Sequence, residues 1–169
     1  MKMPEPIGRP WLLQRGFQGF HTLRELRLTG LEQVPSAPGV YAVIRESAAS
    51  PMFLPNNPGG RFKGRDPTLP VERLGDRWCA TSHIVYIGKA GAAGGASTLR
   101  KRVASYLNFG AGKPVGHWGG RLTWQLDGTD TLILAWSTTQ AAEARKVEST
   151  LLQEIVGLVG RLPFANLRP

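Results

Sequence analysis

The side chain most suggestive of chemistry is Glu148, because it falls within an apolar stripe on the last long helical pattern of the chain. At about 100° per residue, the stripe is formed by Ala144, Val147, Leu151, Leu152, Ile155, Leu158 and Val159. A carboxylate on a buried helix face is costly unless a cation, a metal ion or hydrogen bonds compensate it. Glu148 therefore either lies at the edge of the stripe, where it reaches water or pairs with an arginine, or belongs to a functional site.

A second group of candidate side chains comes from residues 83–107. The apolar, β-branched run 83–89 predicts a buried strand that carries Tyr86 and ends at Gly88 and Lys89. After a glycine-rich segment, apolar residues at helical spacing predict a helix over 97–107 with Ser97 as its N-cap. Arg102 and Tyr106 are four residues apart and therefore share a face of this helix.

The remaining pattern predicts the elements that must position these side chains. Residues 39–44, which include Tyr41, and residues 131–137 read as two further strands. Thr139 is expected to cap a long helix that begins near Gln140 and ends at Gly157 or Gly160. An extended tail containing Asn166 follows, and residues 122–126 are open between a short helix and a short strand.

A chain of 169 residues favours one domain. Residues 1–36 form an N-terminal extension with a helical pattern that Gly30 terminates, and residues 37–169 form the main domain. Within that domain, the proline- and glycine-rich segment 47–82 reads as an insertion at a hairpin. Its Arg61, Lys63 and Arg65 fit a solvated loop better than a phosphate-binding surface.

The charge distribution favours a polyanionic partner. The formal net charge is +9, and no acidic residue occurs between Lys89 and Arg121. Nucleic acid is a better candidate than a membrane, because no amphipathic anchor accompanies the charge. The candidate nucleic-acid-binding residues in and near this stretch are Lys89, Arg100, Lys101, Arg102, Lys113 and Arg121.

Several classes of protein and site do not fit. Cys79 is the only cysteine, so the chain has neither an internal disulfide nor a cysteine-based zinc site. The sequence shows no signal-peptide core and no apolar segment long enough to span a bilayer, and we expect a cytoplasmic protein. Gly88-Lys89 is not a P-loop, because the earlier glycine and the following Ser or Thr are missing.

Taken together, five elements of the sequence resemble the motifs of the GIY-YIG nuclease superfamily. They are Gly39-Val40-Tyr41, Tyr86-Ile87-Gly88-Lys89, the helix with Arg102 and Tyr106, Glu143-Ala144 followed by Glu148, and Pro163-Phe164-Ala165-Asn166. The pattern is most similar to the N-terminal nuclease domain of the bacterial excision-repair endonuclease. The resemblance covers about residues 37–169, with Val40 in place of the usual isoleucine and with a longer excursion between the tyrosine strands.

The resemblance implies a fold and a reaction. The expected fold is an α/β (α+β) sandwich with a small three-stranded antiparallel sheet flanked by helices. The expected reaction is hydrolysis of DNA phosphodiester bonds with one Mg²⁺ or Mn²⁺ ion, for which Glu148 supplies the single protein carboxylate. The implied catalytic residues are Tyr41, Tyr86, Lys89, Arg102, Tyr106, Glu148 and Asn166.

Each of these residues has an implied role. Arg102 holds the scissile phosphate with help from Lys89, and Tyr106 contacts the phosphate or the nucleophile. Either Tyr41 or Tyr86 contacts the attacking water, provided that cations lower its pKa from about 10. Asn166 secures the tail through hydrogen bonds. His117 is an alternative base, although His117, His21 and His83 fit solvent-facing turn positions better.

Other questions stay open at this point. RNA is an alternative substrate, and cutting both strands of a duplex with one site per chain suggests a homodimer or sequential nicking. The biological role could be restriction or defence, repair, or mobility of a genetic element. The competing hypothesis is a nucleic-acid-binding module without catalysis, which predicts salt-sensitive binding and no metal-dependent cleavage.

Overall fold

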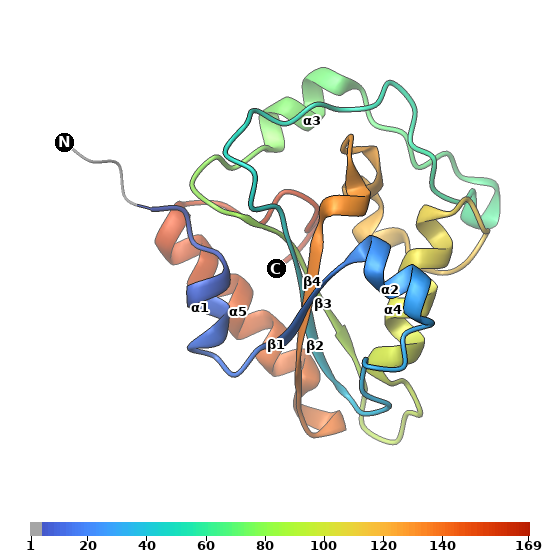
Figure 1. Ribbon diagram of the computed structural model, residues 1–169, viewed down its shortest axis with the longest axis vertical. Helices are drawn as coiled ribbons and strands as arrows, with labels where there is room; N and C mark the ends of the chain where they lie inside the picture. The colour runs from blue at the N-terminus through green and yellow to red at the C-terminus, as the bar shows by residue number, and fades with distance from the viewer. Residues whose placement is uncertain (1–4) are drawn as a thin grey trace.

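The protein is built around a four-stranded antiparallel sheet in the order β1-β4-β2-β3, as a computed structural model describing residues 5–169 shows (Figure 1). The strands are β1 (Gln18–Thr22), β2 (Gly39–Ile44), β3 (Ile84–Ala90) and β4 (Ile133–Thr138). The helices are α1 (Arg9–Leu13), α2 (Leu23–Thr29), α3 (Val71–Arg77), α4 (Leu99–Gly110) and α5 (Ala144–Val159). Short 3-10 segments are η1 (Phe62–Gly64), η2 (Trp118–Gln125), η3 (Thr129–Thr131) and η4 (Ala141–Glu143).

The α+β class is confirmed, but the predicted three-stranded sheet is wrong by one strand. The additional strand, β1, comes from the N-terminal extension and pairs with β4. Its sequence lacks alternating apolar residues, and its register shifts between Gly19 and His21. Gly19 has a positive φ and lies against Trp136, where a β-carbon would overlap the indole ring. The strand is held by its pairing with β4, and the bulge and the close contact at Gly19 leave no periodic pattern in its sequence.

The three predicted strands and the main helices are confirmed, with small shifts at their ends. Two of the predicted helix N-caps are wrong. Thr98, not Ser97, caps α4, because its side chain accepts a hydrogen bond from Lys101 N. Thr139 does not cap α5, since η4 intervenes before that helix begins. Gly30 and Gly160 end α2 and α5 in the left-handed conformation. The first four residues of the predicted extension lie outside the described residues.

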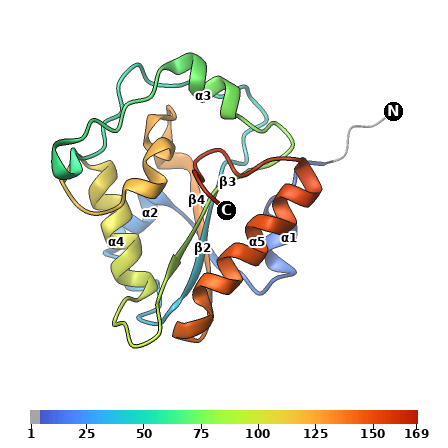
Figure 2. The same cartoon turned by 180° about the vertical axis from the view of Figure 1, so that it is seen from behind.

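Helices cover both faces of the sheet. On one face, α1 and α5 pack against Val40, Ala42 and Ile44 of β2. On the other face, α2, α4 and η2 pack against Tyr41 and Val43. Figures 1 and 2 show the two layers on opposite sides of the strands. Every residue of β2 is buried, which explains why its sequence is continuously apolar instead of alternating.

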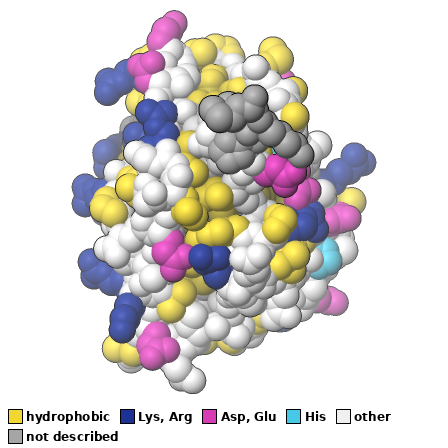
Figure 3. Space-filling model, turned by 90° about the vertical axis from the view of Figure 1, so that its left-hand side faces the viewer, with side chains coloured by type: hydrophobic (Ala, Val, Ile, Leu, Met, Phe, Trp, Pro, Cys, Tyr) yellow, Lys and Arg dark blue, Asp and Glu magenta, His cyan; other side chains and the backbone are white. Residues whose placement is uncertain are grey.

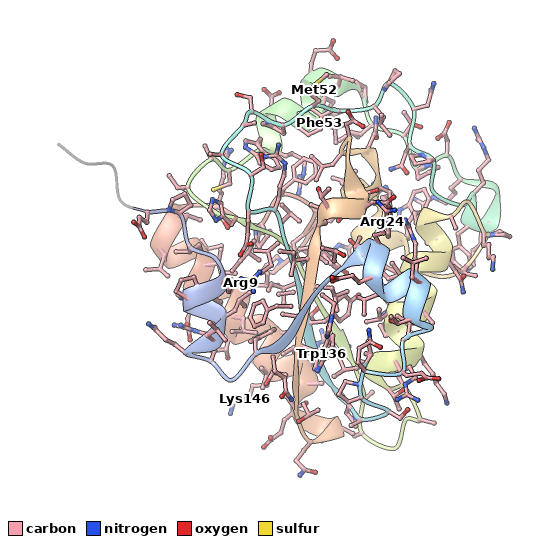
Figure 4. All side chains as sticks on the ribbon, in the orientation of Figure 1. Arg9, Arg24, Met52, Phe53, Trp136 and Lys146 are labelled. Atoms are coloured by element: carbon pink, nitrogen blue, oxygen red, sulfur yellow. The ribbon has the colours of Figure 1, made fainter. Side chains whose placement is uncertain are left out.

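The insertion 47–82 joins β2 to β3, which pair antiparallel as expected. Its Arg61, Lys63 and Arg65 are exposed, as expected of a solvated loop, but the insertion is more ordered than its composition suggested. It contains η1 and α3, and it runs across one end of the sheet (Figure 1). Phe53, which is labelled in Figure 4, belongs to the insertion. Its ring packs against those of Trp78 and Phe164.

Buried amide side chains fix the insertion to the main domain. The Gln125 amide donates to the carbonyls of Leu54 and Leu69 and accepts a hydrogen bond from Leu69 N. Asn57 donates to the carbonyl of Arg121. Because buried backbone groups need partners, these two side chains determine how the insertion lies on η2. Among residues 5–169, no helix is long and apolar enough to cross a membrane.

Replacing Gln125 with methionine should destabilise the protein by about 2–4 kcal/mol, because similar volume is kept while two carbonyls and one N–H lose their buried partner. Urea unfolding measures the difference. Gln33→Ala is the control, since it removes only an exposed hydrogen bond to Thr29 and should cost less than about 0.5 kcal/mol. Equal losses in the two variants would show that Gln125 does not hold the insertion.

Candidate functional site

A pocket of about 420 Å³ brings together four of the predicted site residues. Tyr86 and Lys89 come from β3, Arg102 from α4 and Glu148 from α5. The glycine-rich segment between β3 and α4 closes the pocket with Gly91, Ala92 and Gly95. Residues up to 62 positions apart in the chain therefore line one pocket. Their spacing in the sequence does not by itself bring them together.

A β-bulge in β3 sets the direction of Tyr86. Val43 pairs with Tyr86 and Ile44 pairs with Ile84, so that Val85 is an extra residue on the β3 side. Bulges re-aim the side chains next to them. Tyr86 is 6% exposed and lines the pocket.

Asn166 fixes the outer edge of β3 beside Tyr86. Its side chain accepts a hydrogen bond from Ile87 N and donates one to Ile87 O, both at 2.9 Å. Ala165 N donates to the carbonyl of Val85, and Arg77 donates to the carbonyls of Phe164 and Asn166. The C-terminal tail thus covers the edge of the sheet, as Figure 2 shows, and keeps the backbone on both sides of Tyr86 in place.

Tyr41 lies beneath the pocket and does not line it. The side chain is fully buried, its ring lies over Gly88 on the paired strand, and its hydroxyl is 2.9 Å from His117 Nε2. Of the two tyrosines that could contact an attacking water, only Tyr86 reaches the pocket in this structure.

Tyr106 is placed differently from the expectation that it contacts phosphate or nucleophile. It is fully buried, and its ring stacks on that of Tyr86 with centroids 5.8 Å apart. Its hydroxyl is buried without a hydrogen-bond partner among the described residues. The Tyr106 side chain, four residues after Arg102, thus packs against the Tyr86 ring and is not exposed to solvent.

The structure lowers no phenol pKa in this group. Burial raises the pKa of Tyr86 to about 12, and the charge of Arg102 opposes this effect only in part. Burial also raises the pKa values of Tyr41 and Tyr106. The three phenols keep their protons at neutral pH, contrary to the condition set for a tyrosine base.

His117 is buried, not solvent-facing as its glycine-rich surroundings suggested. Burial, and then the charge of Arg102, hold its pKa well below the usual value, so the imidazole is neutral. Nε2 lies against the Tyr41 hydroxyl, and Nδ1 has no partner among the described residues. The alternative base is thus connected to the pocket only through the phenols. His21 stacks on Trp136 and His83 packs against Gly8, both half-buried.

Glu148 is half-buried and surrounded by cations. Burial raises its pKa, while Lys89, Arg102 and Arg145 act in the opposite direction. No cluster of three or more His, Cys, Asp or Glu side chains that could hold a metal occurs in the described part of the chain. A single carboxylate fits a hard cation such as Mg²⁺ only where water and phosphate oxygens complete the coordination. The donor set is compatible with that arrangement.

The six candidate nucleic-acid-binding residues divide into three groups. Lys89 and Arg102 line the 420 Å³ pocket, and Arg121 lines an adjoining one. Arg100 donates to the carbonyls of Glu32 and Val34 and so holds the segment between α2 and β2. Lys101 and Lys113 are exposed on the surface outside both pockets.

Sequence reasoning missed other residues beside the site. Arg65, Trp118 and Arg168 line an adjoining pocket of about 540 Å³, which shares Tyr86 and Glu148 with the first. Arg65 comes from the insertion, where its composition favoured a solvated loop. Trp118 comes from η2, a 3-10 segment that settles the open assignment of residues 122–126 in favour of a short helix and begins before them.

Comparisons with known proteins give no relative from which a role could be transferred. No family model matches this chain, and neither curated proteins nor solved structures provide a match.

Replacing Gly88 with alanine should destabilise the protein by about 1–3 kcal/mol or more, because a β-carbon there would overlap the Tyr41 ring. Chemical unfolding measures the loss. Gly157→Ala is the opposite control: it lies within α5 with no heavy atom within 4 Å of the added carbon, and alanine should stabilise the helix by about 0.5–1 kcal/mol. A G88A protein as stable as the wild type would mean that Tyr41 does not lie over Gly88.

The phenols should ionise at higher pH in the folded protein than in the chain unfolded in urea. Phenolate absorbance should show no folded-state titration near pH 10, the ordinary tyrosine value, and Tyr86 should ionise near pH 12. Above about pH 10 the unfolded chain releases protons that the folded protein keeps. The stabilisation from the buried phenols is therefore complete below pH 10 and falls as pH rises toward 12. Normal titration of all three tyrosines in the native protein would contradict their burial.

Proposed function

We propose that this protein is a metal-dependent endonuclease that hydrolyses DNA phosphodiester bonds by a one-metal mechanism of the GIY-YIG type. The observation that carries the proposal is the single pocket in which Tyr86, Lys89, Arg102 and Glu148 meet. The fold assignment to the GIY-YIG type belongs to the same proposal. Strands β2, β3 and β4 would form its core sheet, to which β1 adds a fourth strand.

Arg102 and Lys89 would bind the scissile phosphate. Both side chains line the pocket, and neither forms an ion pair with a carboxylate in the described residues. Arg102 is oriented by a hydrogen bond from Nη1 to the carbonyl of Gly116. A guanidinium can hold two phosphate oxygens at once and stabilise the negative charge that builds up during displacement.

Glu148 would hold the divalent cation. When bound there, Mg²⁺ or Mn²⁺ supplies Lewis-acid polarisation of a phosphate oxygen and offsets the carboxylate charge beside Tyr86. Burial, which favours the neutral acid, and the nearby Lys89 and Arg102, which favour the carboxylate, act against each other at this residue. A carboxylate in such a balance interacts strongly with any cation that enters the pocket.

Tyr86 would orient the attacking water. Its hydroxyl is near Gly119, and the residue lines both this pocket and the adjoining one. With its pKa raised to about 12, the phenol keeps its proton and can donate one hydrogen bond while accepting another. Tyr41 and Tyr106 would act through Tyr86 by fixing its ring, and Asn166 would do so by fixing its backbone. These three are therefore positioning residues.

The partner in this proposal is DNA, with RNA as the alternative substrate. One pocket of this kind per chain would cut a duplex either in two successive nicks or as a homodimer. The proposed nuclease would act in the cytoplasm. Its biological role, in defence, repair or the mobility of a genetic element, would depend on features outside the pocket.

A nucleic-acid-binding module without catalysis is the second candidate. The specific observation in its favour is that burial raises the pKa of all three tyrosines, so that no phenol in the site is prepared to accept a proton. Salt-sensitive binding without cleavage would support this candidate.

Glu148→Gln should lower metal-dependent cleavage by roughly a hundredfold or more, because the amide keeps the shape but cannot bind the cation. Nicking of a supercoiled plasmid with Mg²⁺ or Mn²⁺ measures the rate, and circular dichroism checks the fold. The wild-type protein should be inactive when a chelator removes the metal.

The matched control is Glu154→Gln on the same helix, whose carboxylate pairs with Arg15 outside the site. It should cleave like the wild type and lose at most about 1 kcal/mol of stability. Undiminished cleavage by the E148Q protein, prepared in the same way, would refute the proposed function.

A further inference from the structure

The pocket of about 540 Å³ beside the proposed active site is lined by three arginines and by Trp118. It shares Tyr86 and Glu148 with the first pocket, so the two spaces meet at those side chains. Arg65 comes from the insertion, Arg121 from η2 and Arg168 from the C-terminal tail. Three segments far apart in the sequence therefore bring positive charge to one place.

Two of these guanidinium groups are held against the same indole ring. The Arg65 guanidinium lies 4.6 Å from the centroid of Trp118, and that of Arg121 lies 4.5 Å from it. Arg121 also donates from Nη1 to the carbonyl of Trp118. Stacking on an aromatic face restricts an arginine side chain without neutralising its charge or using all of its donors. The Trp118 ring thus orders two cations beside the pocket.

No carboxylate neutralises this pair of arginines in the described structure. Elsewhere Arg9 pairs with Glu46, Arg15 with Glu154 and Arg27 with Asp130. Within the insertion, Asp66 pairs with Arg61 and not with the adjacent Arg65. Burial, and then the positive charges of Arg65 and Arg77, lower the pKa of Arg121. An anion entering the pocket would relieve this repulsion.

Positive charge continues beyond Arg121. A further pocket of about 270 Å³ is lined by three arginines and one acid, Arg73, Arg77, Arg121 and Asp76, so Arg121 belongs to both pockets and cations outnumber the acid. Figure 3, which views the α1 and α5 side, shows Lys and Arg side chains along the left margin, which borders the face seen in Figure 2. A row of cations along joined pockets suits an extended polyanion better than a single small anion.

We propose that Arg65 and Arg121, ordered by Trp118, bind a second backbone phosphate of the nucleic acid whose scissile phosphate is held by Lys89 and Arg102. The insertion 47–82 is then a substrate-binding element. The buried amides of Asn57, within the insertion, and of Gln125, in η2, hold the backbone on either side of Arg65. This inference rests on the proposed function, because it takes the first pocket as the site of the scissile phosphate.

The ligand recognised here is phosphate and not a base. The Trp118 ring is already in contact with two guanidinium groups, so it is not free to stack on a base as aromatic side chains do in single-strand-binding proteins. Guanidinium groups with free donors match the oxygens of a phosphodiester. Contacts of this kind fix the position of the nucleic acid without reading its sequence.

The test is binding of a fluorescein-labelled mixed-sequence DNA duplex, measured by anisotropy over a range of salt concentrations with a chelator present to prevent cleavage. Arg65→Gln should weaken binding several-fold, and the R65Q/R121Q double variant should weaken it roughly tenfold. The slope of log K against log salt concentration should fall by about 0.9 in magnitude for one lost phosphate contact. Arg65 is exposed, so the single variant should fold normally.

Arg61→Gln is the matched control, because Arg61 belongs to the same insertion but is exposed and paired with Asp66. It removes the same formal charge and should leave both the affinity and the salt slope nearly unchanged. Equal affinities and slopes for R65Q and R61Q would overturn the inference, since net charge alone would then explain the binding.

The same proteins separate this inference from the proposed function. If the wild type binds DNA and R65Q reduces the salt slope, but neither Mg²⁺ nor Mn²⁺ supports cleavage, the second phosphate site stands and the nuclease proposal fails. If the wild type cleaves DNA and E148Q does not, while R65Q binds like R61Q, the nuclease proposal stands and the second phosphate site fails.

Discussion

The hydrogen bonds between the Asn166 side chain and both backbone polar groups of Ile87 are the interaction on which the site depends. β3 is an edge strand, and an unpaired edge leaves N–H and C=O groups without partners. One amide side chain satisfies both groups of a single residue, and the tail backbone satisfies the carbonyl of Val85. Tyr86 lies between these two points, so its ring enters the pocket from a backbone that is held on either side.

The tyrosine cluster provides the second level of support. Tyr41, Tyr86 and Tyr106 contact one another at centroid distances of about 6 Å, and Gly88 leaves the space that Tyr41 occupies. Burial that gives the cluster its rigidity also raises the phenol pKa values, so positional order and acidity are in conflict in these residues. In this structure the three side chains are buried and well positioned, and their pKa values are raised as a result. The charges at the surface of the cluster, Arg102 and Glu148, act on Tyr86 in opposite directions.

The sequence predicted those parts of the fold whose cause is local. Continuous apolar runs located β2, β3 and β4, and a 3.6-residue period located α4 and α5, including the position of Glu148. β1 was missed because its bulge breaks any alternating pattern, and because its pairing with β4 and the Gly19 contact with Trp136 depend on tertiary structure. The order within the insertion was missed for a related reason: it depends on Gln125, a residue distant in sequence with no local signature. Helices α4 and α5 pack on the sheet, and this packing brings Tyr86, Lys89, Arg102 and Glu148 together. The burial of His117, Tyr41 and Tyr106 depends instead on how η2 folds over them.

The covering of β3 by the tail has a consequence for self-association. A second copy cannot extend the sheet at that side, since Ala165 and Asn166 already occupy the ladder positions of Val85 and Ile87. The opposite side, β1, is interrupted where Gly19 and Phe20 adopt positive φ, and such irregular strands are poor templates for strand addition. Two copies of this chain would therefore have to meet through helix or loop surfaces, and continuous intermolecular β-structure is disfavoured at both ends of the sheet.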